Sequence, residues 1–125
     1  MNDIEIDSND LAARYAAVFN EADAAVRKGA IAGLWGADAR MCTAANEYVG
    51  LDAITKRVEV AYEKFIVAGG NVFRPLGSAD AHHDGVRIRW EMVPEAGGEA
   101  LSAGAQFLLL DADGLVRIDF QFIDF

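Results

Sequence analysis

The sequence predicts an α+β fold, in which N-terminal helices pack on one face of a curved, mostly antiparallel sheet. Two observations lead to this class. Apolar residues recur at helical spacing between about residues 10 and 68, and after Gly70 the apolar period becomes two. Short turn signals separate the later strands, and consecutive strands joined by short turns pair antiparallel. Helices followed by a strand meander are typical of an α+β domain.

The length and composition favour one globular domain. The chain has 125 residues with no linker or repeat, so we expect a loose arm over residues 1–9 and a single domain over residues 10–125. Its 53% hydrophobic content, combined with a net charge of −9, is typical of a folded protein. The acidic balance disfavours a nucleic-acid partner, and no apolar run approaches the roughly 20 residues of a membrane span. The acidic N-terminus is unlike a signal peptide, so we expect a cytoplasmic protein without a membrane partner.

The first expected helix begins after three residues that are good N-caps, Ser8, Asn9 and Asp10. An apolar stripe at helical spacing follows and predicts a helix to about Lys28, which Gly29 ends. The stripe consists of Leu11, Tyr15, Val18, Phe19, Ala22 and Val26.

Two more helices and a strand are expected before residue 70. A short helix is predicted over residues 30–35, followed by a strand over residues 39–44 that places Met41 and Thr43 on one side. A third helix is predicted over residues 52–68, because its apolar residues again recur at helical spacing and two glycines follow it.

Four strands are predicted in the second half, over about residues 71–79, 86–93, 100–110 and 115–123. Several carry apolar residues on both faces, so both faces of the sheet need cover. The helices supply one cover, and a second subunit is the natural source of the other. We therefore expect a homodimer through the outer sheet face.

The cysteine and histidine content does not predict a metal or cofactor. Cys42 is the only cysteine, which excludes an intrachain disulfide and a thiolate cluster. The two histidines, His82 and His83, are adjacent near an apparent turn, where their side chains point apart. We expect neither a metal site nor a cofactor.

Several motifs, in this order, resemble the nuclear transport factor 2-like superfamily. They are Arg14-Tyr15-Ala-Ala-Val-Phe-Asn20-Glu-Ala-Asp23, Leu34-Trp35-Gly-Ala-Asp38-Ala39, Gly50 with Ile54, and Asp113-Gly114-Leu-Val before an aromatic last strand. Within the superfamily, the chain is similar to the ketosteroid isomerase and SnoaL-like polyketide cyclase group over about residues 10–124. The resemblance implies a cystatin-like cone of three helices on a strongly bent sheet, with an internal hydrophobic pocket.

The isomerase site of that group carries over only in part. Its oxyanion-hole tyrosine matches Tyr15, its general base falls at Thr43, and its second oxyanion donor falls at Gln106. A threonine cannot accept a proton at neutral pH, whereas abstraction of a carbon-bound proton needs a base within reach. The resemblance therefore implies a protein other than a typical ketosteroid isomerase.

The final strand leaves two readings of Asp119 open. Related cyclases place acids and bases at inward positions of this strand, which implies that Asp119 and Gln121 point into the pocket and that burial raises the Asp119 pKa. Simple alternation instead makes Val116, Ile118, Phe120 and Phe122 the core face and leaves Asp119 in water.

The functional expectation follows from this resemblance. The chain binds a small hydrophobic or aromatic molecule, with Asp119 and Tyr15 as the catalytic pair of a cofactor-independent isomerase, cyclase or dehydratase. The alternative is a non-catalytic module of the same fold that binds a ligand or a protein, with Asp119 in solvent. The expected substrate-binding residues are Phe19, Trp35, Met41, Thr43, Trp90, Met92, Gln106 and Gln121.

Overall fold

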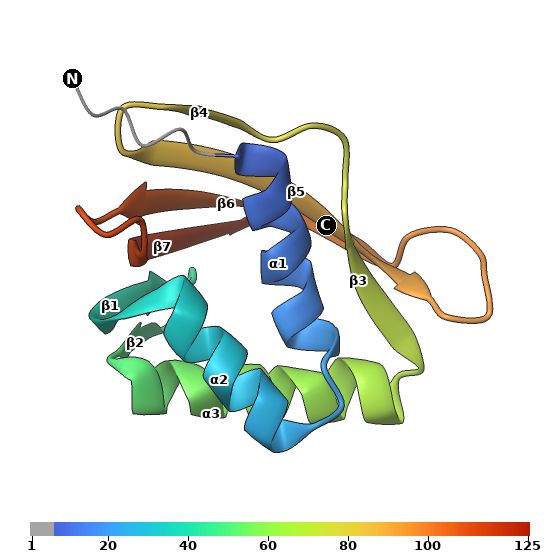
Figure 1. The fold of residues 1–125 in the computed structure, drawn as a ribbon. Coiled ribbons are helices and arrows are strands. Elements are labelled where there is room, and N and C mark those ends of the chain that lie inside the picture. Colours follow the sequence, from blue (N-terminus) through green and yellow to red (C-terminus); the bar gives the residue numbers. More distant parts are fainter. Residues whose placement is uncertain (1–6) are drawn as a thin grey trace.

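A computed structural model describes residues 7–125, which form helices on one side of a single sheet (Figure 1). The helices are α1 (Ser8–Asn20), α2 (Ala24–Leu34) and α3 (Leu51–Ala61), and α3 continues as a π-helix over Tyr62–Ala68. The strands are β1 (Trp35–Cys42), β2 (Glu47–Val49), β3 (Asn71–Pro75), β4 (Asp80–His82), β5 (Gly85–Pro94), β6 (Ser102–Leu110) and β7 (Val116–Ile123). The predicted α+β class is confirmed.

Two aspartates determine where the first helices begin. The Asp7 side chain accepts a hydrogen bond from the Asp10 amide, so α1 starts at Ser8, inside the expected arm. Residues 1–6 of that arm lie outside the described residues. The prediction of one helix that continues to Lys28 is wrong, because α1 ends at Asn20 and a new helix, α2, begins at Ala24. The Asp23 side chain caps α2 by accepting hydrogen bonds from backbone amides of its first turn. Gly29 lies within α2 and ends nothing.

Other boundaries also differ from the sequence prediction. Trp35 begins β1 rather than ending a helix, and residues 47–49 form β2, a short strand paired with β1. The third helix reaches Ala68 as predicted, but its last two turns are wider than an α-helix. The strand expected over residues 71–79 ends at Pro75 as β3, and a separate short strand, β4, begins at Asp80; both pair with β5.

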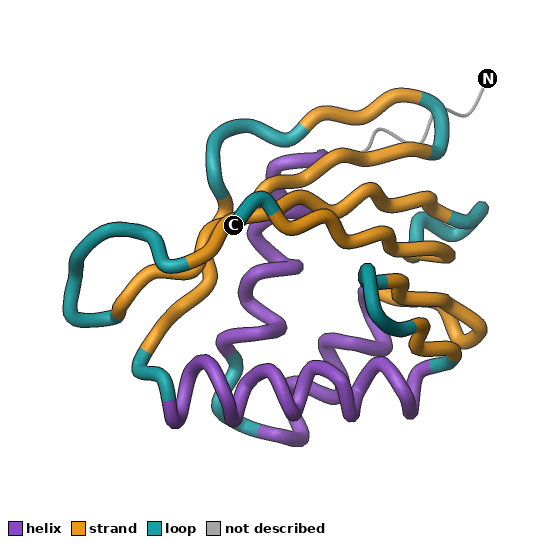
Figure 2. The backbone as a smooth tube through the Cα atoms, turned by 180° about the vertical axis from the view of Figure 1, so that it is seen from behind, coloured by secondary structure: helices purple, strands orange, loops and turns teal. Residues whose placement is uncertain are grey.

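The sheet has the strand order β2-β1-β7-β6-β5-β3, with β4 also paired to β5. The pairs within the second half are antiparallel, as predicted, whereas β1 lies parallel to β7. Seen from behind, the strands curve around the helices, with α1 across the middle of the sheet and the α3 helix along one end (Figure 2). Helices α1 and α3 and the inner face of the sheet border one cavity.

A β-bulge in β7 changes which residues face inward. Leu109 pairs with Ile118 while the next residue, Leu110, pairs with Val116, so Arg117 is an extra residue in β7. A one-residue insertion reverses the alternation beyond it. Val116 and Asp119 are consequently both fully buried, whereas Phe122 is 56% exposed. Simple alternation, which assigned Asp119 to solvent, is wrong for this strand.

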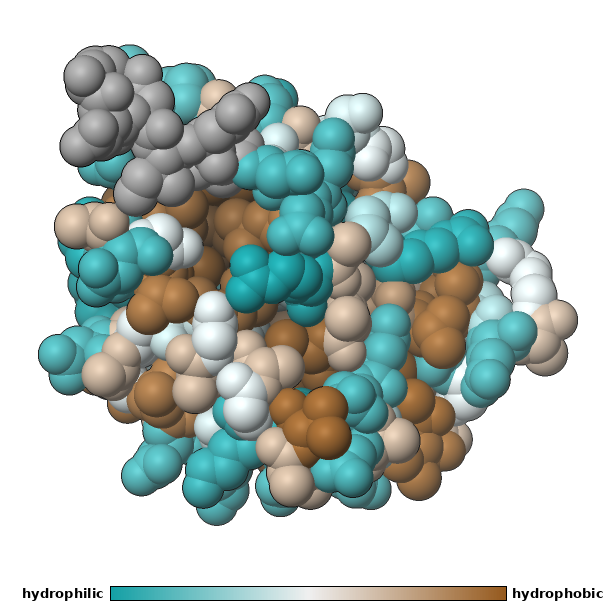
Figure 3. Space-filling model, viewed as in Figure 1, coloured by the Kyte–Doolittle hydropathy of each residue, from teal (hydrophilic) through white to brown (hydrophobic). Residues whose placement is uncertain are grey.

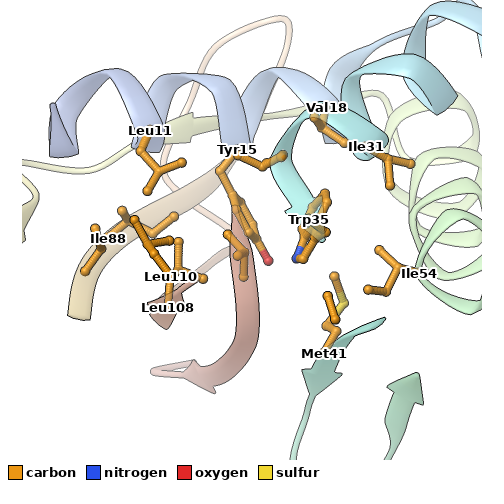
Figure 4. Close-up of a cluster of buried hydrophobic side chains, with 14 of the residues drawn as sticks. Leu11, Tyr15, Val18, Ile31, Trp35, Met41, Ile54, Ile88, Leu108 and Leu110 are labelled. Atoms are coloured by element: carbon orange, nitrogen blue, oxygen red, sulfur yellow. The ribbon is translucent and has the colours of Figure 1, made fainter. Parts of the chain in front are cut away.

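The apolar core lies between α1, α2, α3 and the β1, β5, β6 and β7 strands. Figure 4 shows Tyr15 from α1 and Trp35 from the start of β1 pointing toward each other, with core side chains on both sides. The aliphatic members labelled there are Leu11, Val18, Ile31, Ile54, Ile88, Leu108 and Leu110. Among residues 7–125, no helix is long and apolar enough to span a bilayer.

Candidate functional site

Asp119 is the centre of a buried polar cluster. Its side chain is fully buried and accepts hydrogen bonds from three side chains on three other elements. The Tyr15 hydroxyl donates to Oδ2 over 2.7 Å, and the Trp35 indole N–H donates to the same oxygen over 3.3 Å. Gln106 Nε2 donates to Oδ1 over 2.5 Å. Helix α1 and strands β1 and β6 therefore all meet at this carboxylate.

Trp90 fixes the orientation of the Gln106 amide. The Trp90 indole N–H donates to Gln106 Oε1 over 2.9 Å, which leaves the Gln106 NH₂ group to face Asp119. Each polar atom of this chain of contacts has a partner, as buried polar networks require. The bulge at Arg117 is what brings Asp119 into the cluster, since without it the carboxylate would lie on the outer face.

Burial raises the pKa of Asp119 to about 6 from its ordinary 3.8. Removal from water disfavours the carboxylate form, while the hydrogen bonds from Tyr15, Gln106 and Trp35 favour it and oppose part of that effect. Burial and the neighbouring Asp119 carboxylate raise the pKa of the Tyr15 hydroxyl well above its ordinary value. Tyr15 is thus a neutral hydroxyl at physiological pH, and Asp119 can change protonation near neutrality.

A cavity of about 110 Å³ lies beside this cluster. Tyr15 and Gln106 form part of its wall, whereas Asp119 lies behind them and contributes no wall surface. The wall consists of Tyr15, Ala16, Phe19, Arg57, Ala61, Phe65, Phe73, Trp90, Met92, Ser102, Gln106, Gln121 and Ile123. Edge-on contacts join Phe73 to Phe19, Phe65 and Trp90, so aromatic rings make up much of the lining.

The structure brings together most of the residues expected from the sequence. Those on the cavity wall are Tyr15, Phe19, Trp90, Met92, Gln106 and Gln121. Trp35 and Met41 were expected there but lie in the packed core, because β1 starts at Trp35 and directs both side chains under α1 and α3. Thr43 lies on a separate outer hollow, where its hydroxyl is bonded to the Asn46 backbone in a turn.

Sequence reasoning missed Arg57, Phe65 and Phe73. Arg57 lies on α3, one turn after the buried Ile54 and beside the buried Val58, so its position on the apolar stripe was a usable signal. Another arginine, Arg74, lies outside the cavity and pairs with Glu91 over 2.9 Å.

The described residues contain no group of three or more acidic, cysteine or histidine side chains that could hold a metal ion. His82 and His83 are exposed, and their ring Nδ1 atoms lie 3.1 Å apart near the β4–β5 turn.

Comparisons with solved structures identify the fold. A protein from Agrobacterium tumefaciens, provisionally named an isomerase of the SnoaL-like family, superposes with a TM-score of 0.85 at 23% identity, covering 96% of this chain and 100% of that chain. A protein from Sinorhizobium meliloti, provisionally named a polyketide cyclase, gives 0.66 at 18% identity, covering 90% and 94%. A SnoaL-like protein of unknown function from Burkholderia thailandensis gives 0.62 at 14% identity, covering 93% and 97%. The sequence matches no protein-family model and no curated protein.

The helices and the curved sheet have the cystatin-like α+β fold of nuclear transport factor 2-like proteins. Within that type, the similar structures include SnoaL-like proteins, so the fold predicted from the sequence motifs is confirmed. At these identities the likeness establishes the fold, and any activity must be argued from the site.

Proposed function

We propose that this protein binds a small hydrophobic or aromatic molecule in the cavity and acts on it by cofactor-independent acid–base chemistry of the isomerase, cyclase or dehydratase type. The observation that carries the proposal is the 2.7 Å hydrogen bond between Tyr15, on the cavity wall, and the buried Asp119 behind it. A tyrosine is the only ionisable group of this pair that a ligand in the cavity would touch.

The protonation of Asp119 determines what Tyr15 offers to a ligand. When Asp119 is ionised, Tyr15 donates its proton to the carboxylate and presents an oxygen lone pair to the cavity. When Asp119 is protonated, its O–H donates to the Tyr15 oxygen, and the tyrosine proton is free to bond a ligand carbonyl. The same hydroxyl is thus an acceptor or a donor, depending on one buried proton.

This pair supports a proton relay. A substrate proton moves to the Tyr15 oxygen while the tyrosine proton moves to the Asp119 carboxylate, so Asp119 gains one proton and the substrate becomes an enolate. Return of the proton at another substrate atom regenerates both groups and completes an isomerisation or elimination. Tyr15 is the catalytic residue in this scheme, and Asp119 holds the proton. Gln106 and Trp35 position Asp119.

Exchange of carbon-bound hydrogen tests the relay without knowledge of the natural substrate. Cyclohexanone and acetophenone are incubated in D₂O, and NMR follows the loss of the hydrogens next to the carbonyl. The proposal predicts faster exchange with the native protein, and a decrease of at least about 100-fold in Tyr15→Phe and Asp119→Asn. Tyr62→Phe, which removes a hydroxyl outside the cavity, is the matched control. Exchange that persists in Tyr15→Phe would refute the relay.

The second candidate is a non-catalytic module that binds its ligand in the same cavity. One observation favours it: the described residues that line the cavity do not include Asp119, so a ligand would not touch the carboxylate. This candidate predicts ligand binding, seen as perturbed NMR signals of the wall residues, without any hydrogen exchange.

We also propose that the protein forms a homodimer through the outer face of the sheet. Phe107 and Phe122 lie there in edge-on contact and are 44% and 56% exposed, with Phe120 beside them at 37%. Adjacent exposed aromatic rings favour a protein partner. The opposite, helix side mixes many hydrophilic residues with small hydrophobic areas (Figure 3). Sedimentation tests the proposal: the native chain should be a dimer and Phe122→Lys a monomer. A native monomer at high concentration would contradict it.

A cytoplasmic location without nucleic-acid or membrane partners stays a prediction.

A further inference from the structure

Arg57 is the charged residue on an otherwise uncharged cavity wall. It also lines the outer hollow, together with Gln121 and Ile123, which both spaces share. Arg57 therefore lies between the inner cavity and a wider space bordered by the β1–β2 turn, with Thr43 and Asn46, and by the end of β7.

Arg57 lies on the cavity wall, whose described residues include no acidic side chain to pair with its charge. Within residues 7–125, no ion pair includes Arg57, and its Nε–H is buried without a hydrogen-bond acceptor. The Arg57 guanidinium lies over the Tyr48 ring, 5.6 Å from the ring centroid. The arginines that do pair with carboxylates are Arg40, Arg74, Arg87 and Arg89.

The Arg57 Nε–H is closed to solvent, so the oxygens of a ligand would bond the terminal amino groups of the guanidinium. A guanidinium presents adjacent N–H groups in a planar fork that matches the two oxygens of a carboxylate. The cavity holds no second cation to match the higher charge of a phosphate. The unpaired fork therefore fits a monoanionic carboxylate.

The apolar part of the ligand is limited by the cavity volume. The cavity measures about 110 Å³, and an engineered apolar cavity of about 150 Å³ is known to bind benzene. The rings of Phe65, Phe73 and Trp90 line this space, so a single flat ring is the matching shape.

We propose that Arg57 is a specificity-determining residue that binds the carboxylate of a ligand whose single apolar ring occupies the cavity. The proposal rests on the proposed function only in its use of the cavity as a ligand site, and it narrows the ligand class from small hydrophobic or aromatic molecules to aromatic or alicyclic carboxylates. The net charge of −9 repels anions in general, so any preference for an anionic ligand must come from a local cation.

Calorimetric titration with benzoate and with its neutral analogue benzamide tests the proposal. Benzoate should bind the native protein at least about tenfold more tightly than benzamide, because only benzoate fills both acceptor positions at the guanidinium. Arg57→Gln should bind both compounds equally, with benzamide affinity unchanged, which also shows that the variant is folded. Arg57→Lys, which keeps the charge but loses the fork, should retain only part of the preference. Arg74→Gln removes an exposed, paired arginine and should change neither affinity.

The outcomes separate the two proposals. If benzamide binds as well as benzoate, or if the benzoate preference survives in Arg57→Gln, the role of Arg57 is refuted while the cavity remains a ligand site. If neither compound binds at millimolar concentration, both the Arg57 proposal and the proposed ligand site are refuted.

Discussion

Replacing Asp119 by asparagine should change how the stability of the protein depends on pH. Asparagine keeps an oxygen that can accept from Gln106, and its NH₂ group can donate to the Tyr15 oxygen. The Trp35 N–H loses its acceptor, a loss that does not depend on pH. What the substitution removes is the buried ionisable group. The native and variant proteins therefore differ chiefly in the titration of one carboxyl.

The sign of the effect follows from the raised pKa. Between pH 3.8 and about 6 the folded state holds a proton on Asp119 that the unfolded chain has released, so the native protein loses stability as the pH rises. Above that range the destabilisation caused by the buried carboxylate has reached its full value. A pKa that moves from 3.8 to about 6 corresponds to about 3 kcal/mol at about 1.36 kcal/mol per pKa unit.

Part of this destabilisation is already present in mild acid. At about pH 4.5 the Asp119 carboxyl is mostly ionised in the unfolded chain, so about 1 kcal/mol of the destabilisation is already present. The native protein therefore loses about 2 kcal/mol more of its stability between about pH 4.5 and about pH 7.5. The free energy of unfolding of Asp119→Asn, relative to the native protein, should therefore rise by about 2 kcal/mol between these two pH values. Other groups, such as Glu47 with its lowered pKa, titrate alike in both proteins and cancel in the comparison.

Urea denaturation of both proteins at the two pH values measures this difference directly. The matched control is Asp124→Asn, which removes an exposed carboxylate and should show no such trend. A difference that is constant with pH would show that the three hydrogen bonds balance the burial of Asp119, and one that falls as the pH rises would show that they outweigh it; either result would refute the reasoning.

Four further substitutions test other parts of the structure. Tyr15→Phe removes a hydrogen bond that lowers the Asp119 pKa, so carbon-13 NMR should find that pKa above its native value, and an unchanged or lower value would contradict the contact. Gly104→Ala should destabilise by about 1–3 kcal/mol in urea denaturation, because its methyl carbon would lie 2.6 Å from a β7 carbonyl oxygen, whereas Gly33→Ala, in open space on α2, should stabilise by up to about 1 kcal/mol. Asp23→Ala should cost about 1 kcal/mol by the same assay through loss of the α2 cap, and no loss would mean that the cap is dispensable.

The sequence predicted the fold class well because periodicity and turn chemistry are local properties. The antiparallel strands of the second half, and Trp90, Met92 and Gln106 on the inner face, follow from alternation that stays regular in β5 and β6. The parallel pairing of β1 with β7 joins segments about 80 residues apart, and no local pattern specifies it.

The candidate site was harder to predict because two of its features are not periodic. The inward direction of Asp119 depends on the bulge at Arg117, and a bulge leaves no mark in a simple alternation count. Arg57 occupies an apolar stripe of α3, where a long charged side chain is usually assumed to reach solvent at its tip. In both cases, tertiary context decided the position.

The bulge also affects how this strand can be compared with the corresponding strand of other proteins. If two sequences are aligned without a gap, a protein that lacks the extra residue will have its inward positions matched to the outward Phe120 and Phe122 of this chain. A single gap at Arg117 restores the match to Asp119 and Gln121. The placement of one gap thus decides whether a relative is counted as having or lacking the buried carboxylate, and structures must be superposed before that judgement is made.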